Sequence, residues 1–335
     1  MTRTTGVVAG VVLCTVAMAA CGGTASTSAE RRLPGHASAS PTSVAPSPAW
    51  RATHAAAAYA AWRLPFPVAR AALTSRSGDP RHVLLAGGML RDDSSTGRVV
   101  EIDLTSGRTT RARSLAIPVH DAAGGSFAGH PAVYGGGNST EQSAVQALVG
   151  GRWRQVARLP TTRSDLSVAT VAGESLVIGG YERTSVPRPI LGQRDHRLRQ
   201  LGSLRRGVRY AATAVVGHSV YVFGGEVDHR ELDGVQRVGA RTGRTSVVAH
   251  LPRALGHAVA AYVGGRVLLL GGRVAPDTQT DAMWWFDPAD GRFTPAGRLP
   301  VPVSDASVVS DGRRVWLLGG ETPGVTDRVV VVAVS

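Results

Sequence analysis

The chain has 335 residues, and 43% of them are hydrophobic, which is enough for one large or two ordinary globular domains. All 37 basic residues are arginine, and the net charge of +13 favours anionic neighbours. The only cysteines are Cys14 and Cys21, so the sequence beyond residue 21 excludes a disulfide, a thiolate metal site and a cysteine nucleophile.

Residues 1–20 have the pattern of a signal peptide, with Arg3 followed by an apolar run too short to span a bilayer as a mature helix. The run ends in Met18-Ala-Ala-Cys21, which resembles the lipobox of bacterial lipoproteins. This resemblance implies cleavage before Cys21, lipidation of its thiol, and a place on the outer face of the cytoplasmic membrane. The alternative is ordinary secretion, with cleavage after Ala19.

Residues 21–49 comprise the lipobox cysteine and a stretch rich in Ser, Ala, Pro, Thr and Gly, with almost no large apolar side chains. Such a stretch cannot bury enough surface to fold. We predict a disordered tether between the membrane and a folded domain at residues 50–335.

The folded domain carries six copies of a repeat. A pair of adjacent glycines follows an apolar run at intervals of 44 to 48 residues, and the first glycines of the pairs are Gly87, Gly135, Gly179, Gly224, Gly271 and Gly319. A leucine lies 20 residues before each of the last five pairs and 23 before the first: Leu64, Leu115, Leu159, Leu204, Leu251 and Leu299. An arginine precedes each of the last five leucines by seven residues.

Each copy is typical of β structure, because short apolar runs are separated by glycine turns and no sustained helical period follows the leader. Four short strands per 40–50 residues are typical of a propeller blade. With its glycine pairs and the segments "IDLTSGR" (102–108) and "FDPADGRF" (286–293), the chain resembles the kelch family. Copies 3 and 4 depart from the kelch pattern because no aspartate marks their third strand.

Six copies predict an all-β, six-bladed kelch-like β-propeller. The last copy has room for three strands before the chain ends, whereas "AAAAYAAW" (55–62) precedes the first copy without a glycine pair. We therefore expect this N-terminal segment to supply the fourth strand of the last blade, which closes the ring and hides sheet edges. The glycines themselves are expected to serve close packing.

Six residues after each marker leucine stands a polar residue, followed by an apolar one. This position is expected to open the innermost strand of each blade and to point at one mouth of the central channel. The predicted ligand-binding residues are Arg70, Asp121, Asp165, Tyr210, His257 and Asp305. With histidine neutral their net charge is −2, which suits a small cationic or hydroxyl-rich ligand. The alternative is that these side chains only bind backbone groups at turns.

No catalytic residue, metal site or cofactor is predicted. A copper-radical oxidase of the same architecture needs a crosslinked cysteine, which this domain lacks, and neither HExxH nor GxSxG occurs. The arginine-rich run 194–209 is expected to be solvated surface, with docking to an anionic envelope polymer or lipid headgroups as the alternative.

The sequence therefore favours a binding or scaffolding module at the cell envelope. Its expected partner is an envelope glycan or protein, it is expected to be a monomer, and nucleic acid is not expected because aromatic residues make up only 5%. The alternative is a carbohydrate-active enzyme, similar to the kelch-type mutarotases or to a hydrolase, that uses the same channel-mouth residues.

Overall fold

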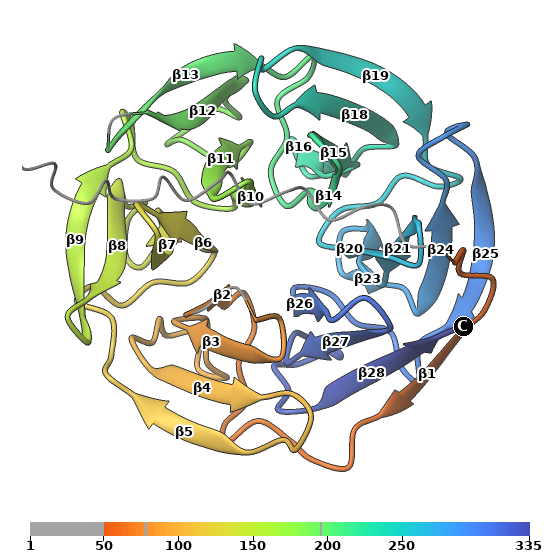
Figure 1. Ribbon diagram of the computed structural model, residues 1–335, viewed down its shortest axis with the longest axis horizontal. Helices are drawn as coiled ribbons and strands as arrows, with labels where there is room; N and C mark the ends of the chain where they lie inside the picture. Colours follow the sequence, from red (N-terminus) through yellow and green to blue (C-terminus); the bar gives the residue numbers. More distant parts are fainter. Residues whose placement is uncertain (1–49, 77–78, 195) are drawn as a thin grey trace, which may run out of the picture. The chain divides into compact units, whose positions relative to one another are not determined.

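The computed structural model describes residues 50–76, 79–194 and 196–335. In this part of the chain all 28 regular elements are β-strands, and six antiparallel four-stranded sheets surround a central axis (Figure 1). The predicted six-bladed, all-β propeller is therefore confirmed. The predicted signal peptide, Cys21 and tether lie outside the described residues.

Each of the first three blades runs from its innermost to its outermost strand in chain order. Blade 1 consists of β2 (Ala72–Ser75), β3 (His82–Ala86), β4 (Val99–Asp103) and β5 (Thr109–Ala112). Blade 2 consists of β6 (Ala123–Phe127), β7 (His130–Tyr134), β8 (Ala144–Val149) and β9 (Arg152–Arg158). Blade 3 consists of β10 (Ser167–Val171), β11 (Glu174–Ile178), β12 (Pro189–Arg194) and β13 (Arg197–Ser203).

The other three blades include two additions that the sequence did not predict. Blade 4 consists of β14 (Ala212–Val216), β15 (Ser219–Phe223), β18 (Gly234–Gly239) and β19 (Thr245–His250). Blade 5 consists of β20 (Val259–Val263), β21 (Arg266–Leu270), β24 (Ala282–Phe286) and β25 (Phe293–Arg298). Blade 6 consists of β26 (Ser307–Ser310), β27 (Arg314–Leu318), β28 (Val329–Val334) and β1 (Ala55–Tyr59). The additions are two short hairpins, β16 (Glu226–Val227) with β17 (Arg230–Glu231) and β22 (Arg273–Ala275) with β23 (Thr278–Gln279).

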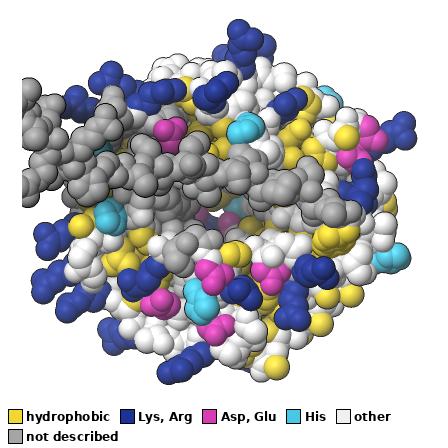
Figure 2. Space-filling model, in the orientation of Figure 1, with side chains coloured by type: hydrophobic (Ala, Val, Ile, Leu, Met, Phe, Trp, Pro, Cys, Tyr) yellow, Lys and Arg dark blue, Asp and Glu magenta, His cyan; other side chains and the backbone are white. Residues whose placement is uncertain are grey.

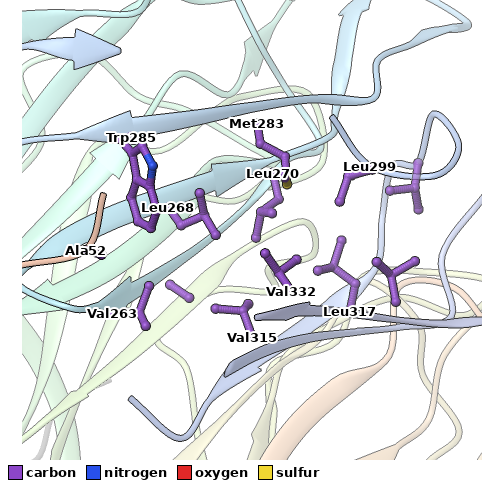
Figure 3. Close-up of a cluster of buried hydrophobic side chains, with 13 residues drawn as sticks. Ala52, Val263, Leu268, Leu270, Met283, Trp285, Leu299, Val315, Leu317 and Val332 are labelled. Atoms are coloured by element: carbon purple, nitrogen blue, oxygen red, sulfur yellow. The ribbon is translucent and has the colours of Figure 1, made fainter. Parts of the chain in front are cut away.

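The core lies between neighbouring blades. The second strand of each blade is buried along nearly its whole length, as β3, β7, β11 and β27 show, because both faces of each sheet are covered. Figure 3 shows one such contact, where Leu268 and Trp285 of blade 5 pack near Val315 and Val332 of blade 6. Outer strands such as β19 and β25 carry most of the exposed positions.

β1 closes the ring as the sequence predicted. It pairs antiparallel with β28 from Ala55 opposite Val334 to Tyr59 opposite Val330. The residues just before β1 also take part, since Ala52 is fully buried and its N–H donates to the carbonyl of Gly264 in blade 5. No helix in the described ranges has the length and apolar character needed to span a bilayer.

The glycine pairs follow the second strands and join each blade to the next. At Gly224 a Cβ would lie 2.1 Å from the carbonyl oxygen of Leu255 in the following blade, and the N–H of Gly225 donates to that same oxygen at 2.9 Å. All six pairs repeat this contact, and Gly319 and Gly320 make it with Val68 of blade 1. The first glycine therefore makes room for the carbonyl that the second one binds.

Candidate binding site at the axial mouth

The six predicted site residues form a closed ring of backbone hydrogen bonds around the axis. The N–H of each residue donates to the carbonyl of its counterpart in the adjacent blade, from Asp121 to Arg70 onward and finally from Arg70 to Asp305, at 2.9 to 3.1 Å. Each residue has a left-handed backbone, with φ between +52° and +56°. Aspartate tolerates this conformation better than most residues, which fits its presence at three of the six positions.

This geometry corrects one expectation from the sequence. The six residues were expected to open the innermost strands, but they lie in a bend two residues before each strand begins, as Tyr210 does before Ala212. The left-handed bend, and not strand alternation, therefore aims them at the axis.

All six side chains line one axial hollow of about 210 Å³, together with small and apolar residues of the first strands. A second hollow of about 240 Å³ shares Arg70, Tyr210 and His257 with the first. Its other walls include Arg209, Glu226 and Arg273. The ring thus lies between the channel and a mouth that is lined with charged groups.

His257 is held between two carboxylates. Its Nδ1 lies 2.7 Å from Oδ1 of Asp305, and its Nε2 lies 3.1 Å from Oε2 of Glu226. Both neighbours accept hydrogen bonds, so a charged imidazole that donates from both nitrogens satisfies the site. Burial opposes that charge, but Asp305 and the two hydrogen bonds outweigh it and raise the pKa of His257 to about 9.

Arginines pair with the remaining carboxylates. Arg70 contacts Glu321 at 3.0 Å and Asp121 at 3.3 Å, and Arg273 contacts both Asp305 at 2.9 Å and Glu321 at 2.8 Å. Burial would raise the pKa of Asp305, but His257 and the two arginines hold it well below its usual range. The net charge of −2 expected for the ring is therefore not what the mouth presents, because His257 is cationic and further arginines join it.

Tyr210 supplies a flat aromatic surface in this network. Its ring stacks on His257 with 3.9 Å between centroids, and the guanidinium of Arg209 lies 5.2 Å from its centroid. Burial, followed by the nearby Asp121 and Asp165, raises the pKa of Tyr210, so its hydroxyl stays protonated.

Asp165 is the least compensated carboxyl of the ring. Its nearest cation is Arg209, at 3.5 Å, and that arginine makes a closer pair with Glu226. Burial and then the charge of Asp121 raise the pKa of Asp165 to about 7. Burial likewise raises the pKa of Asp121 above its ordinary value. Asp165 can therefore exchange a proton near neutral pH.

Sequence reasoning missed the second layer of the mouth. Glu226, Arg273 and Glu321 each directly follow a glycine pair, and each pairs by a β-bridge with the residue just before a ring position. Arg209 is one such partner. The sequence signal that could have revealed this layer is a charged residue directly after three of the six glycine pairs. Each of these residues lies at the same distance along the chain from the ring residue of its own copy.

The described residues contain no group of three or more acidic, histidine or cysteine side chains that could hold a metal ion. The ring carboxylates face arginines and His257 instead. Cys21, the predicted lipidation site, lies outside the described residues.

Comparison with known proteins shows the fold alone. No family model matches the chain, and no curated protein matches it in sequence. A solved structure described as "Structure of YjhT" is similar, with a TM-score of 0.68 and 15% identity over 82% of this chain and 99% of that one. Together with the six blades described above, this similarity shows that the chain has the fold of a six-bladed β-propeller.

Proposed function

We propose that this protein binds a small, neutral, hydroxyl-rich ligand, such as a sugar unit of an envelope glycan, at the axial mouth. The observation that carries the proposal is the hollow of about 240 Å³ in which oriented donors and acceptors stand beside the Tyr210 ring. Guanidinium groups donate in fixed directions and carboxylates accept, so such a hollow can bind several hydroxyl groups at once.

The charge balance supports a neutral ligand. The cations of the network are Arg70, Arg209, Arg273 and His257, and the carboxyl groups are Asp121, Asp165, Asp305, Glu226 and Glu321. The pKa of Asp165, raised to about 7, reduces the negative charge further. A network that is nearly neutral already has little to gain from an added ion, whereas hydroxyl groups can join its hydrogen bonds.

The cellular setting is part of the same proposal. The signal peptide pattern and Cys21 support an exported module that is held at the outer face of the membrane, or else secreted. There it would present the mouth to a glycan or to a glycan-bearing protein, as a monomer.

The test is an NMR or calorimetric titration of the purified protein with a panel of neutral monosaccharides, disaccharides and polyols. Arg273→Gln and Glu226→Gln should each lower the affinity at least tenfold, because each removes an oriented group from the mouth. Arg199→Gln, which changes an exposed arginine on β13, is the control and should bind as the wild type does. Absence of binding by the wild type, or equal binding by all variants, would refute the proposal.

A second candidate is proton-transfer catalysis on the same class of ligand. The observation that favours it is Asp165, a buried carboxyl group whose pKa is raised to about 7 beside the axial hollow. Interconversion of sugar anomers requires a base that takes the proton of the anomeric hydroxyl and an acid that protonates the ring oxygen. Asp165 has the pKa for either task.

Asp165→Asn separates the two candidates. If the protein is an enzyme, this variant should bind the sugar but lose anomer interconversion, as followed by exchange NMR. If the wild type binds a sugar without accelerating its interconversion, the protein is a binding module and not an anomer-interconverting enzyme.

A further inference from the structure

We propose that the axial mouth continues into a second subsite, so that the ligand of this protein is a sugar chain of at least two units and not a free monosaccharide. This inference rests on the function proposed above. The second subsite is a cleft of about 500 Å³ between blades 3 and 4. Its walls come from the segment 181–188 between β11 and β12, from residues 206–209 that lead into blade 4, and from the β16–β17 hairpin.

The cleft and the hollow of the mouth meet at two residues, because Arg209 and His229 line both of them. The hollow of the mouth, at about 240 Å³, is smaller than the roughly 300–1,000 Å³ that is typical of small-molecule sites. The cleft lies within that range. A ligand that filled the mouth alone would therefore leave the larger of two adjoining spaces to water.

Arg209 lies at this junction and is held from both sides. Its guanidinium carbon lies 4.9 Å from the ring centroid of Tyr181 in the cleft and 5.2 Å from that of Tyr210 in the mouth. Its Nε donates to Glu226 at 3.2 Å, and its Nη1 lies 3.5 Å from a carboxylate oxygen of Asp165. A side chain that four groups hold in place is already ordered before a ligand binds, which lowers the entropic cost of binding.

The β16–β17 hairpin provides the other shared residue. Its two turn residues, Asp228 and His229, have φ values of +52° and +57°, a backbone conformation for which such turns usually use glycine or asparagine. The side chain of His229 is 85% exposed, and its Nδ1 lies 3.8 Å from Oε1 of Glu226. The imidazole is therefore accessible to a ligand that passes from the mouth into the cleft.

The cleft itself offers groups that suit a second sugar unit. Thr184 and Ser185 bring exposed hydroxyl groups, and Tyr181 is half-buried in the wall. Arg188 is fixed by a hydrogen bond from its Nε to the carbonyl of Leu204 at 2.9 Å. Its terminal nitrogens have no partner among the described residues and remain available to donate. Hydroxyl groups of a sugar can both donate to and accept from such a set.

Charge alone does not distinguish this cleft from the rest of the surface. Figure 2 shows basic side chains on several sides of the rim, all of them arginines. The cleft differs in its hydroxyl groups and in its junction with the mouth at Arg209 and His229. The length of the ligand, and not its charge, is therefore the property that tests the inference.

The first measurement compares sugars of one, two and three units by calorimetry. The probes are glucose with maltose and maltotriose, glucose with cellobiose and cellotriose, and N-acetylglucosamine with chitobiose and chitotriose. In the series that binds, the disaccharide should bind at least tenfold more tightly than its monosaccharide. Arg273→Gln changes the mouth and should weaken the binding of both.

Thr184→Trp fills the cleft from an exposed position and leaves the residues of the mouth in place. It should bind the monosaccharide as the wild type does but lose the gain for the disaccharide. The matched control is Thr140→Trp, an exposed residue that lies five positions after the first glycine of its pair, as Thr184 does, and that lines neither space. The control should keep the gain.

NMR with labelled tyrosine gives a second readout. The signal of Tyr181, assigned with Tyr181→Phe, should shift when the disaccharide is added and stay in place when the monosaccharide is added. Equal affinity of the wild type for one and two units, or an unchanged gain in Thr184→Trp, would overturn this inference and leave the site at the mouth standing. Absence of binding by every sugar would refute the site at the mouth and this subsite together.

Discussion

At position 224 the backbone has a φ of +55°, and any Cβ would meet the Leu255 carbonyl at 2.1 Å and the Leu232 carbonyl at 2.8 Å. We predict that Gly224→Val lowers the free energy of unfolding by about 3 kcal/mol or more, because a steric clash adds to backbone strain. Gly217→Val is the matched control, with a φ of +57° and no heavy atom within 4 Å of its Cβ. It should lose only about 1–2 kcal/mol, from strain alone. Urea unfolding of both variants decides this, and equal losses would mean that the contact between blades is not tight.

His257 should make stability depend on pH. Its pKa rises from 6.5 to about 9, so the native state holds the proton more tightly than the unfolded chain does. The stabilisation is complete below pH 6.5 and is lost as the pH rises through 9. We expect the free energy of unfolding to fall over this window, by on the order of 3 kcal/mol if the group acts alone.

His257→Gln cannot titrate, so its free energy of unfolding should change little between these pH values. His250→Gln, which replaces an exposed histidine on β19, should keep the decline of the wild type. Denaturant unfolding at several pH values provides the measurement. A parallel decline in wild type and His257→Gln would assign the pH dependence to other groups.

Among the elements, β1 is the strand whose loss should open the ring. A chain that begins at Arg63 lacks β1 and leaves the edge of β28 unpaired. It should aggregate or unfold without cooperativity. A chain that begins at Ala49 retains β1, Trp50 and the buried Ala52, and should unfold as the intact domain does. Calorimetry and light scattering distinguish the two outcomes. Normal folding of the chain that begins at Arg63 would show that β1 is dispensable.

The strands could be predicted because their signals are local and repeated. Apolar runs, glycine pairs and the marker leucines fix the register of each copy, and this register also selected the six ring positions. The contacts of the mouth could not be predicted in this way. Arg70 and Glu321 are 251 positions apart, and His257 and Asp305 belong to different blades. Only closure of the ring brings such residues together, so the left-handed bends and the Glu226, Arg273 and Glu321 layer emerge from the tertiary structure.

For the whole molecule, stability should depend on whether one blade combines strands from both ends of the chain, as blade 6 does with β1 and β28. Joining Ser335 to Trp50 through a short glycine-rich linker allows the chain to be opened elsewhere. Opening before Gly291, between β24 and β25, makes blade 5 the one that combines strands from both ends of the chain. Opening before Arg206 leaves every blade continuous, so that packing alone closes the ring. We predict a thermal midpoint near that of the wild type for the first permutant and a clearly lower one for the second. Equal midpoints would contradict a stabilising role for a blade that combines strands from both ends of the chain.

The ring of hydrogen bonds at the axis has a consequence for how such a protein can change over generations. Its donors and acceptors are main-chain atoms, so replacement of a side chain at position 121, 165 or 257 leaves all six bonds available. The main requirement is tolerance of the left-handed backbone, which costs most residues about 1–2 kcal/mol. A lineage can therefore exchange the groups that face the axis, one blade at a time, while the architecture that presents them persists. Differences in ligand preference between descendants of this chain should accordingly concentrate at these six positions and at the residues that follow the glycine pairs.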